Sequence, residues 1–322
     1  MNFKRKKIEP LLRFEVRRIL QARDVYTLLI LALYTLLASI LYTQLDNAGN
    51  LILVNLTIGF LIIAVSYISV EGNGGRIFLL FKRIYIIPII FFIYDQVQYY
   101  IRVINPHLYD DMLIRWDYIL FGVNPTEWLM QFTTPVLTEF LQFSYMTYFF
   151  LPLILGIELH RRKNYHEFNQ FASMILFSFY FSYILYFIFP AIGPRFTIHE
   201  FSSTYTEMPG IWLADFFREM VNRGGGIPEG AADPVKYVNR DCMPSGHTWV
   251  TAVVIYLAFK YRSFFRWVIL LFGISLIIGT VYLRYHYVVD IIAGLILAAM
   301  TIYLEPKIRI LLKKAGFSKI RE

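Results

Sequence analysis

Two short segments in the last third of the chain carry the residue types best suited to chemistry. The first is Pro244-Ser245-Gly246-His247, and 39 positions after its histidine comes His286, followed by Asp290. The whole chain has only six histidines, and both of these stand at the beginning of an apolar run. The pair is the strongest sequence clue to a function.

His286 and Asp290 are four residues apart, a spacing that puts two side chains on one face of a helix about one turn apart. A carboxylate there accepts the Nδ1 proton of the imidazole and leaves Nε2 with a free lone pair, as a nucleophile or a base. Asp290 stands in an otherwise apolar run, where an ionisable residue usually has a function. The alternative is a purely structural hydrogen bond between helices.

The Pro-Ser-Gly-His segment has the features of a helix start. Pro244 stops any preceding helix, Ser245 is a good N-cap, and Gly246 lets a ligand approach the backbone. Free N–H groups at a helix start bind anions, and phosphate is the obvious one. His247 would then stand beside the phosphate as a proton donor.

Four basic residues are candidates for binding the phosphate. Arg195 and Arg284 offer guanidinium forks suited to phosphoryl oxygens, and Lys236 and Arg240 are further candidates for phosphate binding. Each of the four has an alternative role as an interfacial basic residue that reaches lipid headgroups.

A zinc site assembled from His247, His286, Asp290 and Asp241 is possible by ligand type. The His-x3-Asp pair lacks a compact third ligand, and a single cysteine, Cys242, excludes a Cys-based structural zinc site. We therefore expect no metal ligand set and no cofactor.

The composition places these residues in a membrane protein. Hydrophobic residues make up 57% of the 322 residues and the mean hydropathy is +0.51, too apolar for a soluble fold of this length. The formal charge of +8 then reports orientation and headgroup contact, and we expect no nucleic-acid partner. We predict an all-α polytopic bundle of about eight transmembrane helices, at roughly 25–43, 51–70, 84–101, 136–157, 169–190, 247–260, 266–283 and 287–304.

Eight crossings place both termini on one side, and the basic residues choose the side. With cytoplasmic termini, 23 of the 31 Lys and Arg residues lie on the cytoplasmic side, as the positive-inside rule requires. His247, His286, Arg195 and Arg284 then share the outer face: periplasmic, extracellular or lumenal.

We divide the chain into a basic N-terminal segment with two accessory helices (1–83), a main membrane domain (84–304) and a basic tail (305–322). Residues 105–135 are too polar to span and predict an interfacial helix and a turn on the outer face. The long loop 191–243 carries helical spacing over 211–221 and a glycine break, and we interpret it as a partial lid, the alternative being an ordinary connector.

Pro244-Ser245-Gly246-His247 and His286-x3-Asp290 resemble two signatures of the type 2 phosphatidic acid phosphatase superfamily. Within it, the run Tyr282–Asp290, Gly193-Pro194-Arg195 and Asp117-x3-Phe121-Gly122 look like the branch related to inositol phosphorylceramide synthases. The resemblance covers roughly residues 84–304.

This resemblance implies metal-independent phosphoryl transfer from a phospholipid, sphingolipid or polyprenyl phosphate. His286 would form a phosphohistidine, Asp290 would orient and balance it, and His247 would protonate the leaving oxygen. The backbone at Ser245 and Gly246, with Arg195 and Arg284, would hold the phosphoryl oxygens.

The chain departs from the family pattern at two places. Where the family has Lys-x6-Arg-Pro, Ile188 stands seven residues before Arg195 and Phe196 follows it, and Thr280 occupies the position of an arginine six residues before His286. The branch resemblance favours a lipid phosphotransferase that moves an inositol-phosphate-type headgroup. The alternatives are a simple phosphatase and, with less support, a non-catalytic scaffold or transporter.

Overall fold

The computed structural model describes residues 16–70 and 75–317. The start of the predicted basic N-terminal segment, residues 1–15, and the end of the predicted basic tail, residues 318–322, lie outside this range. Over the described residues the fold is a helical bundle with no strand, and one isolated bridge joins Ala191 to Asp241. The prediction of an all-α polytopic bundle is confirmed.

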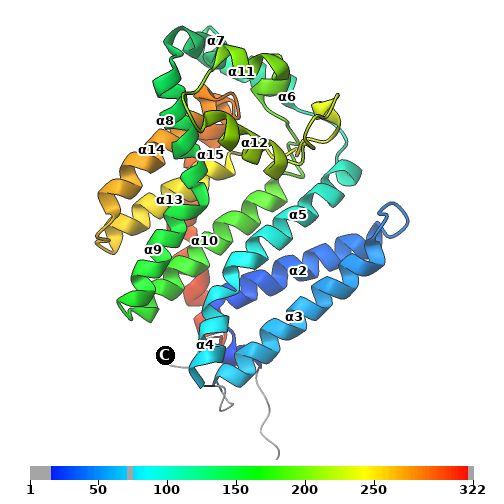
Figure 1. The fold of residues 1–322 in the computed structure, drawn as a ribbon. Coiled ribbons are helices and arrows are strands. Elements are labelled where there is room, and N and C mark those ends of the chain that lie inside the picture. The colour runs from blue at the N-terminus through cyan, green and yellow to red at the C-terminus, as the bar shows by residue number, and fades with distance from the viewer. Residues whose placement is uncertain (1–15, 71–74, 318–322) are drawn as a thin grey trace, which may run out of the picture.

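Eight helices or helix pairs make up the body of the bundle (Figure 1). They are α2 (Ala22–Ile40), α3 (Ala48–Val70), α4 with α5 (Gly75–Ile84, Ile86–Ile104), α8 with α9 (Pro135–Met146, Phe150–Arg161), α10 (Tyr165–Leu185), α13 (Gly246–Lys260), α14 (Arg266–Tyr282) and α15 (Val288–Lys314).

Six of these stretches are long and apolar enough to cross a membrane: Ala22–Ile40, Ala48–Ser69, Ile77–Ile104, Pro135–Arg161, Tyr165–Leu185 and Val288–Lys314. The two other predicted spans fold as the shorter apolar helices α14 and α13, of 17 and 15 residues. At 1.5 Å per residue they are roughly 22–26 Å long, slightly less than the apolar core of a bilayer.

Short helices gather at one end of the bundle, opposite the end where α15 finishes (Figure 1). They are α6 (Asp110–Phe121), α7 (Pro125–Leu129), α11 (Thr204–Glu207) and α12 (Ala214–Gly224), while α1 (Val16–Ile19) precedes α2. Trp212, just before α12, and Phe216, within it, are exposed, as expected for an element lying at a membrane interface. Glu139 of α8 fixes its start by accepting hydrogen bonds from four successive backbone N–H groups, at residues 211–214.

Two predicted boundaries differ from the structure. The span predicted at 136–157 is broken by a 3₁₀ turn, Thr147–Phe149, in which Thr147 Oγ1 donates to the Ser144 carbonyl oxygen at 2.6 Å. The last helix does not end at 304 but continues to Lys314, because buried Glu305 pairs with Arg309 one turn later and accepts a hydrogen bond from Tyr26 of α2.

In the described part of the chain, one large cluster of buried hydrophobic residues joins the long helices, and four smaller clusters are separate from it. Helix α10 packs against α2, α5, α9, α13 and α15, and it contributes most of its length to the buried cluster. The accessory helix α3 packs mainly on α2, with a reciprocal amide pair between Asn55 and Gln96 joining it to α5 at 2.8 and 3.0 Å.

Candidate active site

The His286–Asp290 pair is built at the start of α15. His286 stands in the turn before the helix, and Asp290 is the third residue of the helix, where its Oδ2 accepts the backbone N–H of Tyr287 at 2.9 Å. This capping contact turns the carboxylate back toward the preceding turn, so that Oδ2 lies 3.3 Å from His286 Nδ1. The pair therefore meets across a helix cap, and not on one helical face as the spacing alone predicts.

A thiol completes the surroundings of this carboxylate. Cys242 lies in the loop before α13, and its Sγ donates to Asp290 Oδ2 at 2.9 Å. Burial, and next the Asp290 carboxylate, raise the pKa of Cys242 well above its ordinary value, so the sulfur keeps its proton at neutral pH. Asp290 Oδ1 is buried with no hydrogen-bond partner.

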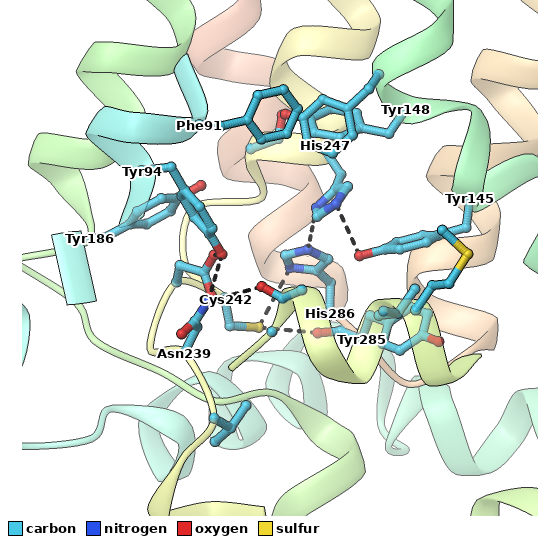
Figure 2. A pocket seen from close by; sticks show the side chains of 18 of the residues that line it. Phe91, Tyr94, Tyr145, Tyr148, Tyr186, Asn239, Cys242, His247, Tyr285 and His286 are labelled. Atoms are coloured by element: carbon cyan, nitrogen blue, oxygen red, sulfur yellow. Dashed lines mark hydrogen bonds between the residues drawn. The ribbon is translucent and has the colours of Figure 1, made fainter. Parts of the chain in front are cut away.

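His247 stands in the first turn of α13, behind the N-cap Ser245, whose hydroxyl accepts the Thr248 N–H. Its Nδ1 lies 3.3 Å from His286 Nε2, and its Nε2 lies 3.0 Å from the hydroxyl of Tyr145 (Figure 2).

One proton order satisfies every contact in this row. Tyr145 donates to His247 Nε2, His247 Nδ1–H donates to His286 Nε2, and His286 Nδ1–H donates to Asp290, an assignment inferred from the hydrogen-bond network. Nε2 of His286 consequently carries the lone pair that faces His247.

The starts of α13 and α15 are hydrogen-bonded to each other. The Ser245 N–H donates to the Asp290 carbonyl oxygen at 3.2 Å. A Cβ at Gly246 would lie 2.5 Å from the Tyr186 hydroxyl, and one at Gly294 of α15 would lie 2.8 Å from the Ser245 carbonyl oxygen. Small residues at these two positions allow α13, α10 and α15 to approach as closely as the histidine pair requires.

Arg195 comes from a 3₁₀ turn, Pro194–Phe196, that is itself fastened to the site. Gly193 has φ of +94°, and a Cβ there would lie 2.7 Å from the Tyr285 carbonyl oxygen. The Arg195 guanidinium is buried, donates to Asn222 of α12 at 2.8 Å and lies 5.0 Å from the Tyr285 ring centre. It reaches the wall of the cavity that His247 and His286 also line.

The other three basic candidates lie outside the cavity wall. Arg284 is fully buried and faces Glu207 of α11, with 2.6 Å between Nη1 and Oε2. Arg240 turns to the Pro106 carbonyl oxygen at 2.8 Å, and Lys236 is exposed beside the Tyr237 ring. The structure thus brings Arg195 to the histidines and keeps Arg284, Arg240 and Lys236 away from them.

Two carboxylates of α6 position the site, a task the sequence did not suggest for them. Asp117 accepts the N–H groups of Val288 and Val289 at 2.9 and 2.8 Å and so caps α15. Asp110, two turns earlier on α6, accepts the N–H groups of Ile192 and Gly193 ahead of Arg195. Burial raises the pKa of both, to about 6 for Asp117.

A cavity of about 350 Å³ opens in front of the histidines (Figure 2). Besides His247, His286 and Arg195, its polar wall includes Asp241, which accepts the Tyr94 hydroxyl at 2.5 Å, and Asn239, which donates to the same hydroxyl at 2.9 Å. Burial raises the pKa of Asp241. Another part of the cavity wall comes from α12 and the residue after it, through Met220, Val221, Gly224 and Gly225. The long loop therefore covers part of the site.

An apolar groove continues from this cavity along the bundle. It has a volume of about 360 Å³ and lies between α5, α9 and α10. Ile90, Phe91, Phe149 and Phe179 line both spaces, so the two are contiguous. Arg83 and His160 stand at its far end, near the opposite end of the bundle.

Sequence reasoning missed the tyrosines, Cys242 and the α6 carboxylates. The sequence offered two signals for the carboxylates: Asp117 belongs to the Asp117-x3-Phe121-Gly122 resemblance, and the seven-residue spacing of Asp110 and Asp117 puts both on one helix face. Tyr145 and Tyr148 gave no signal, because they reach His247 only through the 3₁₀ break in their helix.

Comparison with known proteins gives one family and one relative. The chain is 27% identical over 176 residues to a PA-phosphatase related-family protein of Dictyostelium discoideum. The aligned part covers 49% of this chain and 30% of that relative, so the chain spans less than a third of its length. No solved structure matches the chain. The family model described as the PAP2 superfamily matches residues 112–304, a range that holds Arg195, His247, His286 and Asp290. Because this match covers more than half of the chain, the protein belongs to the PAP2 superfamily.

Proposed function

We propose that this membrane protein transfers the phosphoryl group of a lipid phosphate through a phosphohistidine on His286. The observation that carries the proposal is the hydrogen-bonded row from Tyr145 through His247 and His286 to Asp290, ending in a cavity that also receives Arg195. A base held in one tautomer, a second histidine beside it and a buried guanidinium are the parts that phosphoryl transfer needs.

In the first step His286 Nε2 attacks phosphorus while the bond from phosphorus to the lipid oxygen breaks. The phosphorus atom enters between the two imidazoles and takes the place of their 3.3 Å hydrogen bond. His247, which first takes up a proton from solvent on Nε2, gives its Nδ1 proton to the departing oxygen and becomes neutral. The transferred proton comes from Nδ1, the nitrogen that faces His286, so Nε2–H stays in place and the Tyr145 hydroxyl accepts from it before and after the transfer.

The phosphorylated imidazole is cationic, and Asp290 balances that charge at 3.3 Å from Nδ1. In the second step His247 takes a proton from the incoming hydroxyl, whose oxygen forms the new bond to phosphorus while the bond to Nε2 breaks. Arg195 and the N–H groups at the start of α13 hold the phosphoryl oxygens in both steps.

The lipid part of the substrate fits the apolar groove. A phosphate at the histidines places its hydrocarbon chain between α5, α9 and α10, past Phe91 and Phe149. A phospholipid, a sphingolipid and a polyprenyl phosphate all present an anionic head and an apolar chain of this kind.

The acceptor decides between a hydrolase and a transferase. The cluster of Asp241, Tyr94 and Asn239 in the cavity wall favours an alcohol with several hydroxyl groups, such as an inositol, because it offers both acceptors and donors at fixed positions. Water as the acceptor gives a simple phosphatase, the second candidate.

We further propose that the site lies on the outer face of the membrane and both termini on the cytoplasmic side. The support is the charge count, because this orientation leaves 23 of the 31 Lys and Arg residues of the sequence on the cytoplasmic side.

The test uses the full chain in detergent with chelator present and three phosphate donors: phosphatidic acid, a sphingolipid phosphate and a polyprenyl phosphate. Phosphate release and transfer to inositol are followed together. Radiolabelled phosphate should be trapped on wild-type protein in an acid-labile, alkali-stable form, and not on His286→Ala. Turnover without any trapped label in rapid-quench samples would argue against the covalent step.

A further inference from the structure

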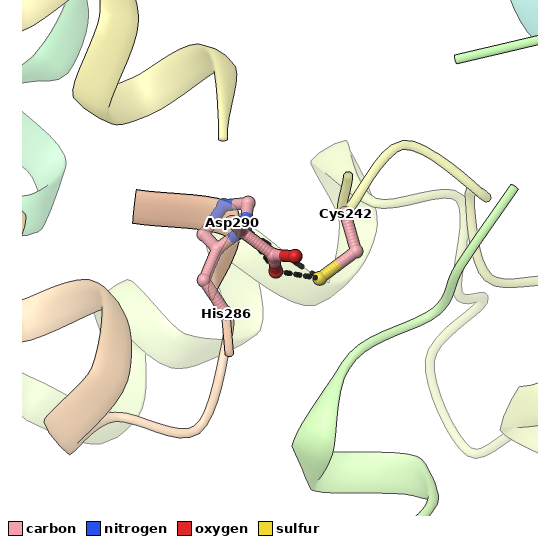
Figure 3. A group of neighbouring side chains, drawn as sticks. All are labelled: Cys242, His286 and Asp290. Atoms are coloured by element: carbon pink, nitrogen blue, oxygen red, sulfur yellow. Dashed lines mark hydrogen bonds and ion pairs between the residues drawn. The ribbon is translucent and has the colours of Figure 1, made fainter. Parts of the chain in front are cut away.

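Asp290, His286 and Cys242 together form a candidate metal-ligand set, of which the proposed chemistry leaves Cys242 without a role. Cys242 Sγ, His286 Nδ1 and Asp290 Oδ2 face one point from two separate chain segments, the loop before α13 and the start of α15 (Figure 3). These ligand atoms all lie within 4.8 Å of one another, and all three residues are buried. Cysteine, histidine and aspartate are the residue types that zinc binds.

The separations suit a tetrahedral ion. Zinc bonds of about 2.0–2.3 Å at tetrahedral angles put neighbouring ligand atoms about 3.3–3.6 Å apart. Here Sγ to Nδ1 is 3.5 Å and Nδ1 to Oδ2 is 3.3 Å. The third edge, Sγ to Oδ2, is 2.9 Å and needs to open by about half an ångström.

A second observation points to a missing partner in the same place. Asp290 Oδ1 is completely buried and accepts no hydrogen bond, although the other oxygen of this carboxylate has three donors. An unpaired carboxylate oxygen is costly in such a setting, and a cation on the carboxylate removes that cost. Cys242 and His286 both line the open cavity, which gives an ion and its fourth ligand, a water molecule, a way in.

We propose that Cys242, His286 and Asp290 form an inhibitory zinc site that switches the active site off. Zinc takes the thiolate sulfur, and the thiol proton leaves to solvent through the cavity. It also takes the lone pair of His286 Nδ1, so the imidazole hydrogen resides on Nε2. Nε2 then has no lone pair for phosphorus, and the nucleophile of the proposed function is lost. Cys242 is the compact third ligand that the sequence alone does not reveal.

The inhibition rests on the proposed function, whereas the binding does not, so both are measured. Zinc is added to the full chain in detergent during turnover of phosphatidic acid, and cobalt is added in a separate spectroscopic titration. Wild type should show zinc inhibition reversed by chelator, and one equivalent of cobalt should give a sulfur-to-metal charge-transfer band in the near ultraviolet.

Variants identify the ligands. Cys242→Ala and Cys242→Ser should lose the cobalt band, and the zinc concentration for half-inhibition, relative to each variant's own metal-free rate, should rise roughly 100-fold or more. Cys242→Ser keeps a hydroxyl donor for Asp290, which separates the loss of a ligand from the loss of that hydrogen bond. His199→Gln, whose imidazole contacts Thr126 instead of the cluster, is the matched control and should bind as wild type does.

The outcomes are distinguishable. A cobalt band that depends on Cys242 in a protein without turnover would keep the metal site and sink the proposed function. Equal zinc inhibition of wild type and Cys242→Ala, or activity that requires zinc, would overturn the inhibitory site. Absence of the cobalt band in wild type would overturn it as well.

Discussion

Tyr145 holds His247 from the side opposite His286. Its hydroxyl lies 3.0 Å from His247 Nε2, and the two rings stack with 4.7 Å between their centres. The imidazole is thus fixed in orientation before any substrate binds, with Nδ1 directed at His286.

Tyr145→Phe should lower kcat by about 10- to 100-fold with little change in KM, because the ring still packs while the proton-transferring histidine loses its hydroxyl partner. Tyr282→Phe is the matched control. The Tyr282 hydroxyl is also buried in this part of the bundle, but it bonds Thr138 and not a cavity residue. Equal effects of the two changes on kcat would show that Tyr145 acts only through packing.

Asp290→Asn should reduce turnover by about 10²- to 10⁴-fold, since an amide nitrogen facing Nδ1 favours the tautomer with hydrogen on Nε2. His286→Ala should abolish turnover, while both proteins still insert and fold. Steady-state rates and thermal unfolding in detergent check both points. Near wild-type rates in either variant would remove His286 as the nucleophile.

Asp117 gives a stability test with a defined sign. Its pKa is raised from 3.8 to about 6 by burial, so the folded state holds a proton that the unfolded state releases between these values. The stabilisation is full below about pH 4 and is lost as pH rises through about 6. The free energy of unfolding of wild type relative to Asp117→Asn should therefore fall over this window. A flat difference from pH 4 to pH 7 would contradict the raised pKa.

A substitution at Gly156 tests whether the apolar groove holds the lipid chain. Gly156 lines the groove on α9, and a Cβ there would lie 3.1 Å from the Phe171 ring, so a larger side chain occupies the path of the lipid chain. Gly156→Leu should lower kcat/KM about 10- to 100-fold for long-chain lipid phosphates and leave short-chain ones nearly unchanged. Gly59→Leu, in α3 and away from the groove, is the control for an added apolar side chain. A loss independent of chain length would show that the groove does not hold the lipid.

Membrane orientation is open to labelling. A cysteine at exposed Ser202 should react with an impermeant reagent added outside intact cells, and one at exposed Lys313 should react only after the membrane is opened. Wild type measures the background, because its one cysteine is buried. The reverse pattern would invert the proposed topology.

The sequence predicted the fold well because the length and apolarity of a segment are enough to identify a membrane helix. All eight predicted spans correspond to helices, and the polar segments before α8 and α13 became the short helices of one end. The His286–Asp290 contact was also predictable, although its geometry was not. Spacing fixes which residues are near one another, whereas the cap at Tyr287 decides how they meet.

The rest of the site depends on contacts between distant segments. Tyr145 reaches His247 across 102 positions, and Cys242 reaches Asp290 across 48. Nothing local marks either residue. The basic candidates show the same limit, because Arg195 and Arg284 look alike in sequence and only packing sends one to the cavity and the other to Glu207.

The hydrogen bond from the Ser245 N–H to the Asp290 carbonyl oxygen joins the two helix starts that carry the histidines. The two histidines are positioned by the starts of α13 and α15. Helix α12 and the adjoining glycines, which line the cavity, belong to a separate loop. Glu139 and Asn222 make hydrogen bonds that hold this loop. The two histidines and the covering helix α12 therefore lie in different parts of the chain, whereas Arg195 belongs to the same loop as α12. Under the proposed function, exchanging α12 alone between related proteins, with Arg195 kept, should change the acceptor and leave the phosphorus chemistry in place.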